Sequence, residues 1–140
     1  MGDVRLATIS AGPLNVAAHL AAVSDPAAGA EVFFVGTVRN HDHGRGVIQL
    51  DYSSHPSAPD VVAAVAAELA ARDGVIAVAV THRIGVLSIG EIAIVAAVSA
   101  AHRGVAFTAC SDLVDEVKKR LPVWKRQVFT DGTDEWVNSA

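Results

Sequence analysis

The amino-acid sequence predicts an α+β fold, a single domain over residues 1–140 in which helices pack on a mainly antiparallel sheet. Two β-rich runs, 75–84 and 91–99, are joined by only six residues, a spacing typical of antiparallel neighbours. Two other segments, 59–72 and 99–120, carry apolar residues at helical spacing, so each has one side that faces a core. The 140 residues are 51% hydrophobic and 19% charged, which suits one domain with a sizeable core.

The first half of the chain alternates short strands and helices. Residues 4–9 form a predicted strand, and a predicted helix begins at Asn15. Residues 31–38 and 47–52 are rich in β-branched and aromatic side chains, whereas residues 39–46 between them are charged and contain two glycines. We therefore expect the two β-rich segments to pair as a hairpin, with 39–46 as a mobile polar loop.

The last third of the chain is predicted as a helix followed by extended segments. The helix opens at 99–103, and its core side is formed by Phe107, Cys110, Val114 and Val117. Pro122 ends it, because proline cannot continue the helical hydrogen bonds. Residues 124–129 are then extended, and a turn at 131–132 leads to a last short strand at 136–137.

Composition excludes several classes of protein. The formal net charge of −4 disfavours a general nucleic-acid binder, because duplex binding needs a basic face. The single cysteine cannot form an internal disulfide, and the N-terminus shows no secretory signal pattern. No stretch reaches about 18 uninterrupted apolar residues. We expect a cytoplasmic protein that neither binds nucleic acid nor crosses a membrane, so any anion-binding site must be local.

Cationic groups stand at both ends of the last predicted helix. His102 and Arg103 lie at its start, where free N–H groups favour an anionic ligand, although both residues could also be merely solvated beside a cap. Lys118 lies at its end, where the helix dipole alone explains a cation. Because Pro122 can turn the chain back, Lys125 can approach Lys118. Two such ammonium groups lower each other's pKa, which suits acid–base catalysis near neutral pH.

Four other places in the sequence are candidates for a site. Arg39 follows a predicted strand and is suited either to bidentate phosphate binding or to a surface pair with Asp42. The histidines at 41–43 lack the spacing of a metal site, so no metal is expected. Cys110 lies on the apolar side of its helix, which predicts a buried structural thiol rather than a nucleophile. His82 ends an apolar run and is assigned a structural role, at a sheet edge.

Four segments carry motifs whose order and separation are more specific than any one of them. They are Phe34–His41, His82–Gly85 with Gly90-Glu91, Ser99–Arg103 with Phe107, and Lys118–Arg126. Together they resemble the family of the large, catalytic subunit of molybdopterin synthase, over residues 31–137. The resemblance implies an α/β hammerhead-type fold and a dimer of large subunits.

The resemblance also implies a role for each candidate residue. Lys118 and Lys125 belong to the reaction centre. Around the anionic pterin substrate lie His102, Arg103 and Arg39, of which Arg39 reaches into the site of the neighbouring protomer. The implied partner is a small ubiquitin-like sulfur carrier, whose C-terminal thiocarboxylate enters each pocket of a heterotetramer.

The implied reaction converts cyclic pyranopterin monophosphate into molybdopterin. Two dithiolene sulfurs are installed, one from each of two successive carrier thiocarboxylates, without a metal or organic cofactor. One alternative is a non-catalytic dimeric module, an inactive paralogue that binds an anion or the carrier. Another is a metal-dependent phosphoester hydrolase that uses the histidines. Product formation that depends on the carrier distinguishes the synthase from both.

Overall fold

The structure of the protein is a computed structural model that describes residues 2–138. Its larger sheet has the strand order β1 (Asp3–Ser10), β5 (Val75–Arg83), β7 (Ile92–Ala100) and β2 (Ala30–Thr37). β1 runs parallel to β5, and the other neighbours are antiparallel. The predicted α+β class with a mainly antiparallel sheet is confirmed, and so is the antiparallel pairing of the two β-rich runs.

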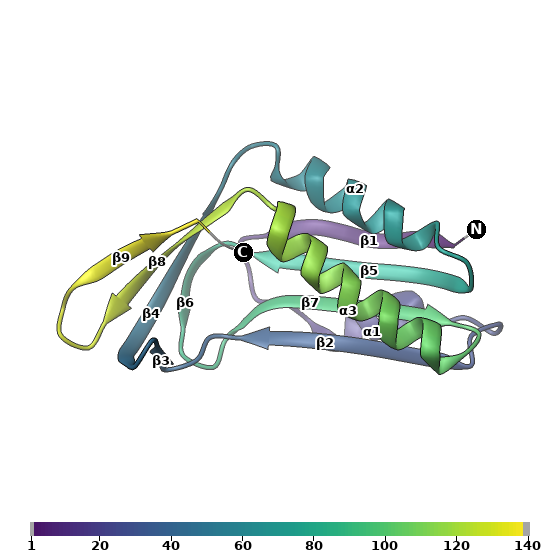
Figure 1. Cartoon of the computed structure of the whole chain (residues 1–140), viewed down its shortest axis with the longest axis horizontal. Helices are drawn as coiled ribbons and strands as arrows, with labels where there is room; N and C mark the ends of the chain where they lie inside the picture. Colours follow the sequence, from purple (N-terminus) through teal and green to yellow (C-terminus); the bar gives the residue numbers. More distant parts are fainter. Residues whose placement is uncertain (1, 139–140) are drawn as a thin grey trace.

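A smaller sheet projects from one end of the larger one (Figure 1). Its strand order is β3 (His41–Asp42), β4 (Arg45–Ser54), β8 (Val123–Phe129) and β9 (Asp134–Val137). The connection between β5 and β7 contributes β6 (Gly85–Ser88), which also pairs with β4. The predicted extended segment after the last helix is therefore a strand of this second sheet, and the predicted last short strand is the end of β9.

Three helices in the described part of the chain cover the larger sheet (Figure 1). α2 (Ala58–Ala70) and α3 (Arg103–Arg120) pack on one face, and α1 (Val16–Val23) packs on the other. Because successive strand residues point to opposite faces, β7 sends Val98 toward α2 and α3 and Ala97 toward α1. None of these helices is long and apolar enough to cross a membrane.

The core side of α3 is only partly as predicted. Cys110, Val114 and Val117 are buried, as their helical spacing indicated. Phe107, however, is 60% exposed, contrary to the prediction. This side of α3 lies against β2, the edge strand of the sheet, so the ring of Phe107 lines an open groove beside Phe33 instead of entering the core.

Residues 31–38 and 47–52 do not pair as a hairpin, so this prediction was wrong. β2 pairs with β7, whereas β4 pairs with β8 and β6, and the two segments belong to different sheets. The residues between them form β3 and a tight turn, in which His43 and Gly44 have φ angles of 48° and 77°. Two consecutive positive φ angles match the twist of a hairpin. A short local hairpin therefore replaces the expected mobile loop.

The last helix starts later than predicted. Ser99 belongs to β7 and is fully buried, and α3 begins at Arg103 with His102 at its N-cap position. The strand extends through this segment because β7 has neighbours on both sides, which satisfy its backbone groups. The predicted end is confirmed, since α3 stops at Arg120, just before Pro122.

Candidate active site

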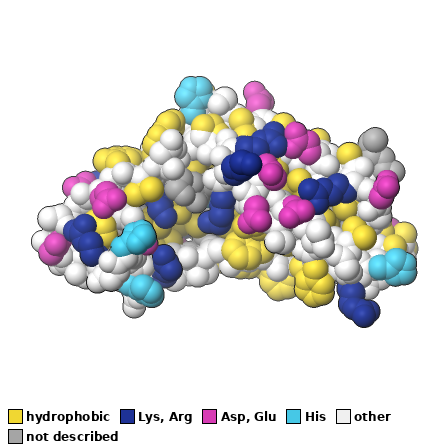
Figure 2. Space-filling model, viewed as in Figure 1, with side chains coloured by type: hydrophobic (Ala, Val, Ile, Leu, Met, Phe, Trp, Pro, Cys, Tyr) yellow, Lys and Arg dark blue, Asp and Glu magenta, His cyan; other side chains and the backbone are white. Residues whose placement is uncertain are grey.

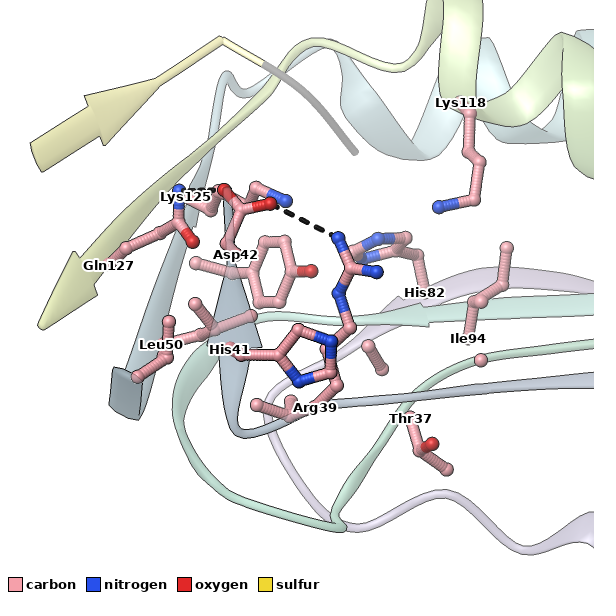
Figure 3. A pocket seen from close by; sticks show the side chains of 15 residues that line it. Thr37, Arg39, His41, Asp42, Leu50, His82, Ile94, Lys118, Lys125 and Gln127 are labelled. Atoms are coloured by element: carbon pink, nitrogen blue, oxygen red, sulfur yellow. Dashed lines mark hydrogen bonds and ion pairs between the residues drawn. The ribbon is translucent and has the colours of Figure 1, made fainter. Parts of the chain in front are cut away.

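A cavity of about 220 Å³ lies where the two sheets meet, beside the C-terminal end of α3 (Figure 3). Of the predicted site residues, Lys118, Lys125 and Arg39 line it. Figure 2 shows cationic side chains around the hollow between the smaller sheet and the helices. Strands of both sheets supply the other polar side chains of the cavity: Thr37, His41, Asp42, Tyr52, His82 and Gln127.

Lys125 lines the cavity because the side chains of β8 alternate between the two faces of the strand. Val123 and Gln127, two residues away on either side, are buried on the same face of this strand. Burial lowers the pKa of Lys125, and the charges of Lys118 and Arg39 lower it further. The predicted influence of Lys118 on Lys125 is thus present, but burial is the larger cause.

Lys118 is the cation of the last turn of α3 that faces the cavity (Figure 3). Arg120, two residues later, instead pairs with Glu68 of α2 and lies 3.7 Å from Glu116 of its own helix. Residues that are two positions apart point to different sides of a helix. Arg120 therefore pairs with α2, whereas Lys118 lines the cavity.

Arg39 lines the cavity of its own chain. Its reach into the site of a neighbouring protomer, which the resemblance implies, stays a prediction. Its Nη2 donates a hydrogen bond to Oδ1 of Asp42 at 3.1 Å. The other oxygen of Asp42 accepts one from Nε2 of Gln127 at 3.0 Å. This hydrogen bond holds the pKa of Asp42 below its usual value, with added effects of the nearby cations. The surface pair considered for Arg39 is therefore formed, at the rim of the cavity.

His102 and Arg103 lie at the opposite end of α3 from Lys118, and both are exposed. The helix has 18 residues, so its two ends are about 27 Å apart. Within one chain the structure therefore does not bring His102 and Arg103 to the cavity.

His82 lies in the wall of the cavity and is 1% exposed. Its Nδ1–H donates a hydrogen bond to the carbonyl oxygen of Arg83 at 2.7 Å, and its ring packs edge-on against Tyr52, with 5.0 Å between the ring centroids. Burial, with a smaller effect of Lys118, lowers the pKa of His82 to about 4. The expected place at a sheet edge was wrong, because β5 lies between β1 and β7.

The family of proteins described as MoaE protein matches residues 9–120 of the chain. This chain belongs to the MoaE family. The matched range includes Arg39, His102, Arg103 and Lys118, and Lys125 follows it on the next strand.

Named relatives of this MoaE-family chain are molybdopterin synthase catalytic subunits. The one from Neosartorya fischeri is 44% identical over 124 residues, which are 88% of this chain and 66% of that protein. The one from Bacillus subtilis is 36% identical over 130 residues, which are 92% of this chain and 82% of that protein. The chain thus spans slightly less than two thirds of the fungal relative. A crystal structure of molybdopterin synthase from Staphylococcus aureus is similar with a TM-score of 0.86 at 29% identity, and covers 94% of this chain and 96% of its own.

The pKa of His82 predicts an acid-sensitive fold for this MoaE-family chain. An unfolded histidine binds its proton near pH 6.5, whereas folded His82 does so only near pH 4. Stability contributed by neutral His82 is therefore present above pH 6.5 and is lost as the pH falls toward 4. From about pH 7.5 to pH 5 we expect a loss of roughly 2 kcal/mol from this group. Urea unfolding of wild type and His82→Gln at both pH values measures it, and equal losses in the two proteins would contradict the prediction.

The single cysteine of the chain does not line the cavity. Cys110 is 3% exposed, and burial raises its pKa to about 11, so the predicted buried structural thiol is confirmed. Within residues 2–138, no three side chains of the metal-ligating kinds are grouped to hold a metal ion.

Sequence reasoning did not single out Gln127 or Tyr52. Gln127 stands two residues after Lys125, so the alternation of an extended segment already placed both on one face. Tyr52 is the cross-strand partner of Lys125, a pairing between β4 and β8 that no local pattern reveals.

Proposed function

We propose that this chain is the catalytic subunit of a molybdopterin synthase that acts in the cytoplasm. It transfers two sulfurs, one from each of two successive carrier thiocarboxylates, to cyclic pyranopterin monophosphate and so forms the dithiolene of molybdopterin. The observation that supports this best is the gathering of Lys118, Lys125 and Arg39 around one cavity, in a chain of net charge −4. The names of its relatives point to the same activity.

In the proposed mechanism, the cations of the cavity handle the negative charge of the substrate and of the intermediates. The exposed guanidinium of Arg39 binds the phosphate through two parallel hydrogen bonds. Lys118 and Lys125 transfer protons and stabilise anionic intermediates. The lowered pKa of Lys125 suits this role, because an ammonium group that loses its proton more readily is a better acid. The sulfur comes from the carrier, so the mechanism requires no protein thiol, metal or organic cofactor.

The proposed assembly contains two copies of this chain and two small ubiquitin-like sulfur carriers, each with its C-terminal thiocarboxylate in one cavity. An exposed aromatic surface supports the pairing of two copies. Phe33, Phe34 and Phe107 are 48%, 38% and 60% exposed and line one open groove. Figure 2 shows hydrophobic side chains gathered over β2 and α3. Apolar surface beside an unpaired strand edge is typical of a face that another chain covers.

A second copy also gives His102 and Arg103 a place in the reaction. One small substrate cannot bridge the length of α3, about 27 Å, to reach both ends of the same helix. We therefore assign His102 and Arg103 to the site of the neighbouring protomer, where they bind the phosphate of the pterin. Each site then combines the two lysines of one chain with His102 and Arg103 of its partner.

A reconstituted assay with cyclic pyranopterin monophosphate and a thiocarboxylated carrier tests the proposed function. The expected result is dithiolene product that requires both the chain and the carrier, and a carrier that ends in an ordinary carboxylate should give none. If a carrier proven active with another large subunit gives no product, a non-catalytic module that binds an anion or the carrier is the better account. Phosphate release that needs no carrier and stops with a chelator would indicate a phosphoester hydrolase instead.

A further inference from the structure

Asp42 contacts groups from several elements that meet at the cavity. Its two oxygens accept hydrogen bonds from Arg39 at 3.1 Å and from Gln127 at 3.0 Å. Figure 3 shows the carboxylate between these two side chains, with Lys125 beside it. Asp42 thus connects the segment after β2 and the β3–β4 hairpin with β8.

The charges around Asp42 are positive. Among the described residues that line the cavity, Asp42 alone carries a carboxylate. Its surroundings include His43 on its own hairpin, Lys125 of β8 and Arg39 after β2, while Lys118 of α3 acts on Lys125. A phosphate group that enters the cavity therefore meets the same cations that Asp42 partly neutralises.

We propose that Asp42 is a positioning residue that serves as an internal counter-anion, which holds Arg39 in the absence of substrate and releases it to the phosphate of the substrate. The inference rests on the proposed function only for the identity of that anion as a phosphate ester. Gln127 holds the other oxygen, so the carboxylate stays anchored to β8 while Arg39 turns to the ligand.

The geometry favours this exchange. The Arg39 side chain is 68% exposed and makes a single hydrogen bond to Asp42, and ion pairs of this kind are weak. A phosphate offers the guanidinium two charged oxygens in a bidentate arrangement. After the exchange the carboxylate remains near Lys125, where its charge opposes the effect of burial and raises the pKa of the lysine. Asp42 thus competes with the phosphate for Arg39 and supports the charge of Lys125.

The test replaces Asp42 with asparagine, which keeps the size of the side chain and removes its charge. Inorganic phosphate is the probe, its binding is measured by calorimetry, and the titration of Lys125 is followed by NMR. We expect Asp42→Asn to bind phosphate about three- to tenfold more tightly, because a repelling charge is gone. Lys125 should titrate at lower pH than in wild type, because the charge that raises its pKa is lost.

Two control variants separate charge from structure. Asp42→Glu keeps the charge, so both readouts should return toward the wild-type values. Asp60→Asn makes the same chemical change in the exposed first turn of α2, and both readouts should stay at the wild-type values. Phosphate binding in Asp42→Asn that is unchanged or weaker, or an unshifted titration of Lys125, would overturn the proposal. Neither readout needs sulfur transfer, so a failed synthesis assay would count against the proposed function and leave this inference standing.

Discussion

Replacing Lys125 with glutamine is expected to lower the rate of dithiolene formation by about 10²- to 10⁴-fold, the range that general acid–base groups contribute. Burial lowers the pKa of Lys125, so its ammonium group releases a proton more readily than that of a surface lysine. Glutamine keeps much of the length and the hydrogen-bonding capacity but cannot exchange a proton near neutral pH. Single-turnover product formation with a saturating amount of loaded carrier measures the effect on the chemical step, apart from substrate binding.

Two further variants serve as controls for the rate measured with Lys125→Gln. Lys119→Gln is the matched control, because Lys119 is an exposed neighbour of Lys118 that does not line the cavity, and it should keep the wild-type rate. Lys125→Arg keeps the positive charge but not a group that gives up its proton. It should be as slow as Lys125→Gln if proton transfer matters, and close to wild type if the charge alone is sufficient. A folded Lys125→Gln protein that keeps more than about a tenth of the wild-type rate would contradict the assignment.

The sequence predicted most elements of the fold correctly, because strand and helix patterns are local. The pairing of the strands was harder to predict. Residues 31–38 and 47–52 are close in sequence and rich in β-formers, which favours a hairpin, yet β2 pairs with β7 and β4 pairs with β8. These partners lie far along the chain, and only the packing of the whole sheet selects them. The start of α3 was misplaced for a related reason, since ladder hydrogen bonds on both sides keep Ser99 in a strand.

Part of the candidate site could be predicted from a local sequence pattern. Pro122 indicated that Lys125 turns back toward Lys118, and the structure places both at one cavity. The pair of Asp42 and Gln127 was not predictable, because 85 residues separate them and a contact between two strands joins them. The pairing of His82 with Tyr52 likewise depends on how the two sheets meet.

Mixed dimers of two inactive variants are expected to regain turnover, and they test whether each site is shared between two protomers. One parent carries His102→Ala with Arg103→Ala, the other carries Lys125→Gln, and each is expected to be nearly inactive on its own. In a dimer of the two parents, a shared site combines Lys125 of the first chain with His102 and Arg103 of the second. That site is intact and the other is doubly defective, so we expect about half of the wild-type turnover per dimer.

Mixed dimers isolated through two different affinity tags give the measurement, and each parent purified in the same way gives the baseline. If His102 and Arg103 acted within their own chain, every site of the mixed dimer would keep one defect and no activity would return. Because Lys118 follows Arg103 by 15 residues of α3, the two lie about 22 Å apart along the helix axis, and that outcome would also mean that His102 and Arg103 do not bind the same substrate as the lysines. Recovered turnover in the mixed dimer would therefore show that the two ends of one helix serve two different sites. If a parent dimer were active on its own, the residues substituted in it would not be needed for the reaction.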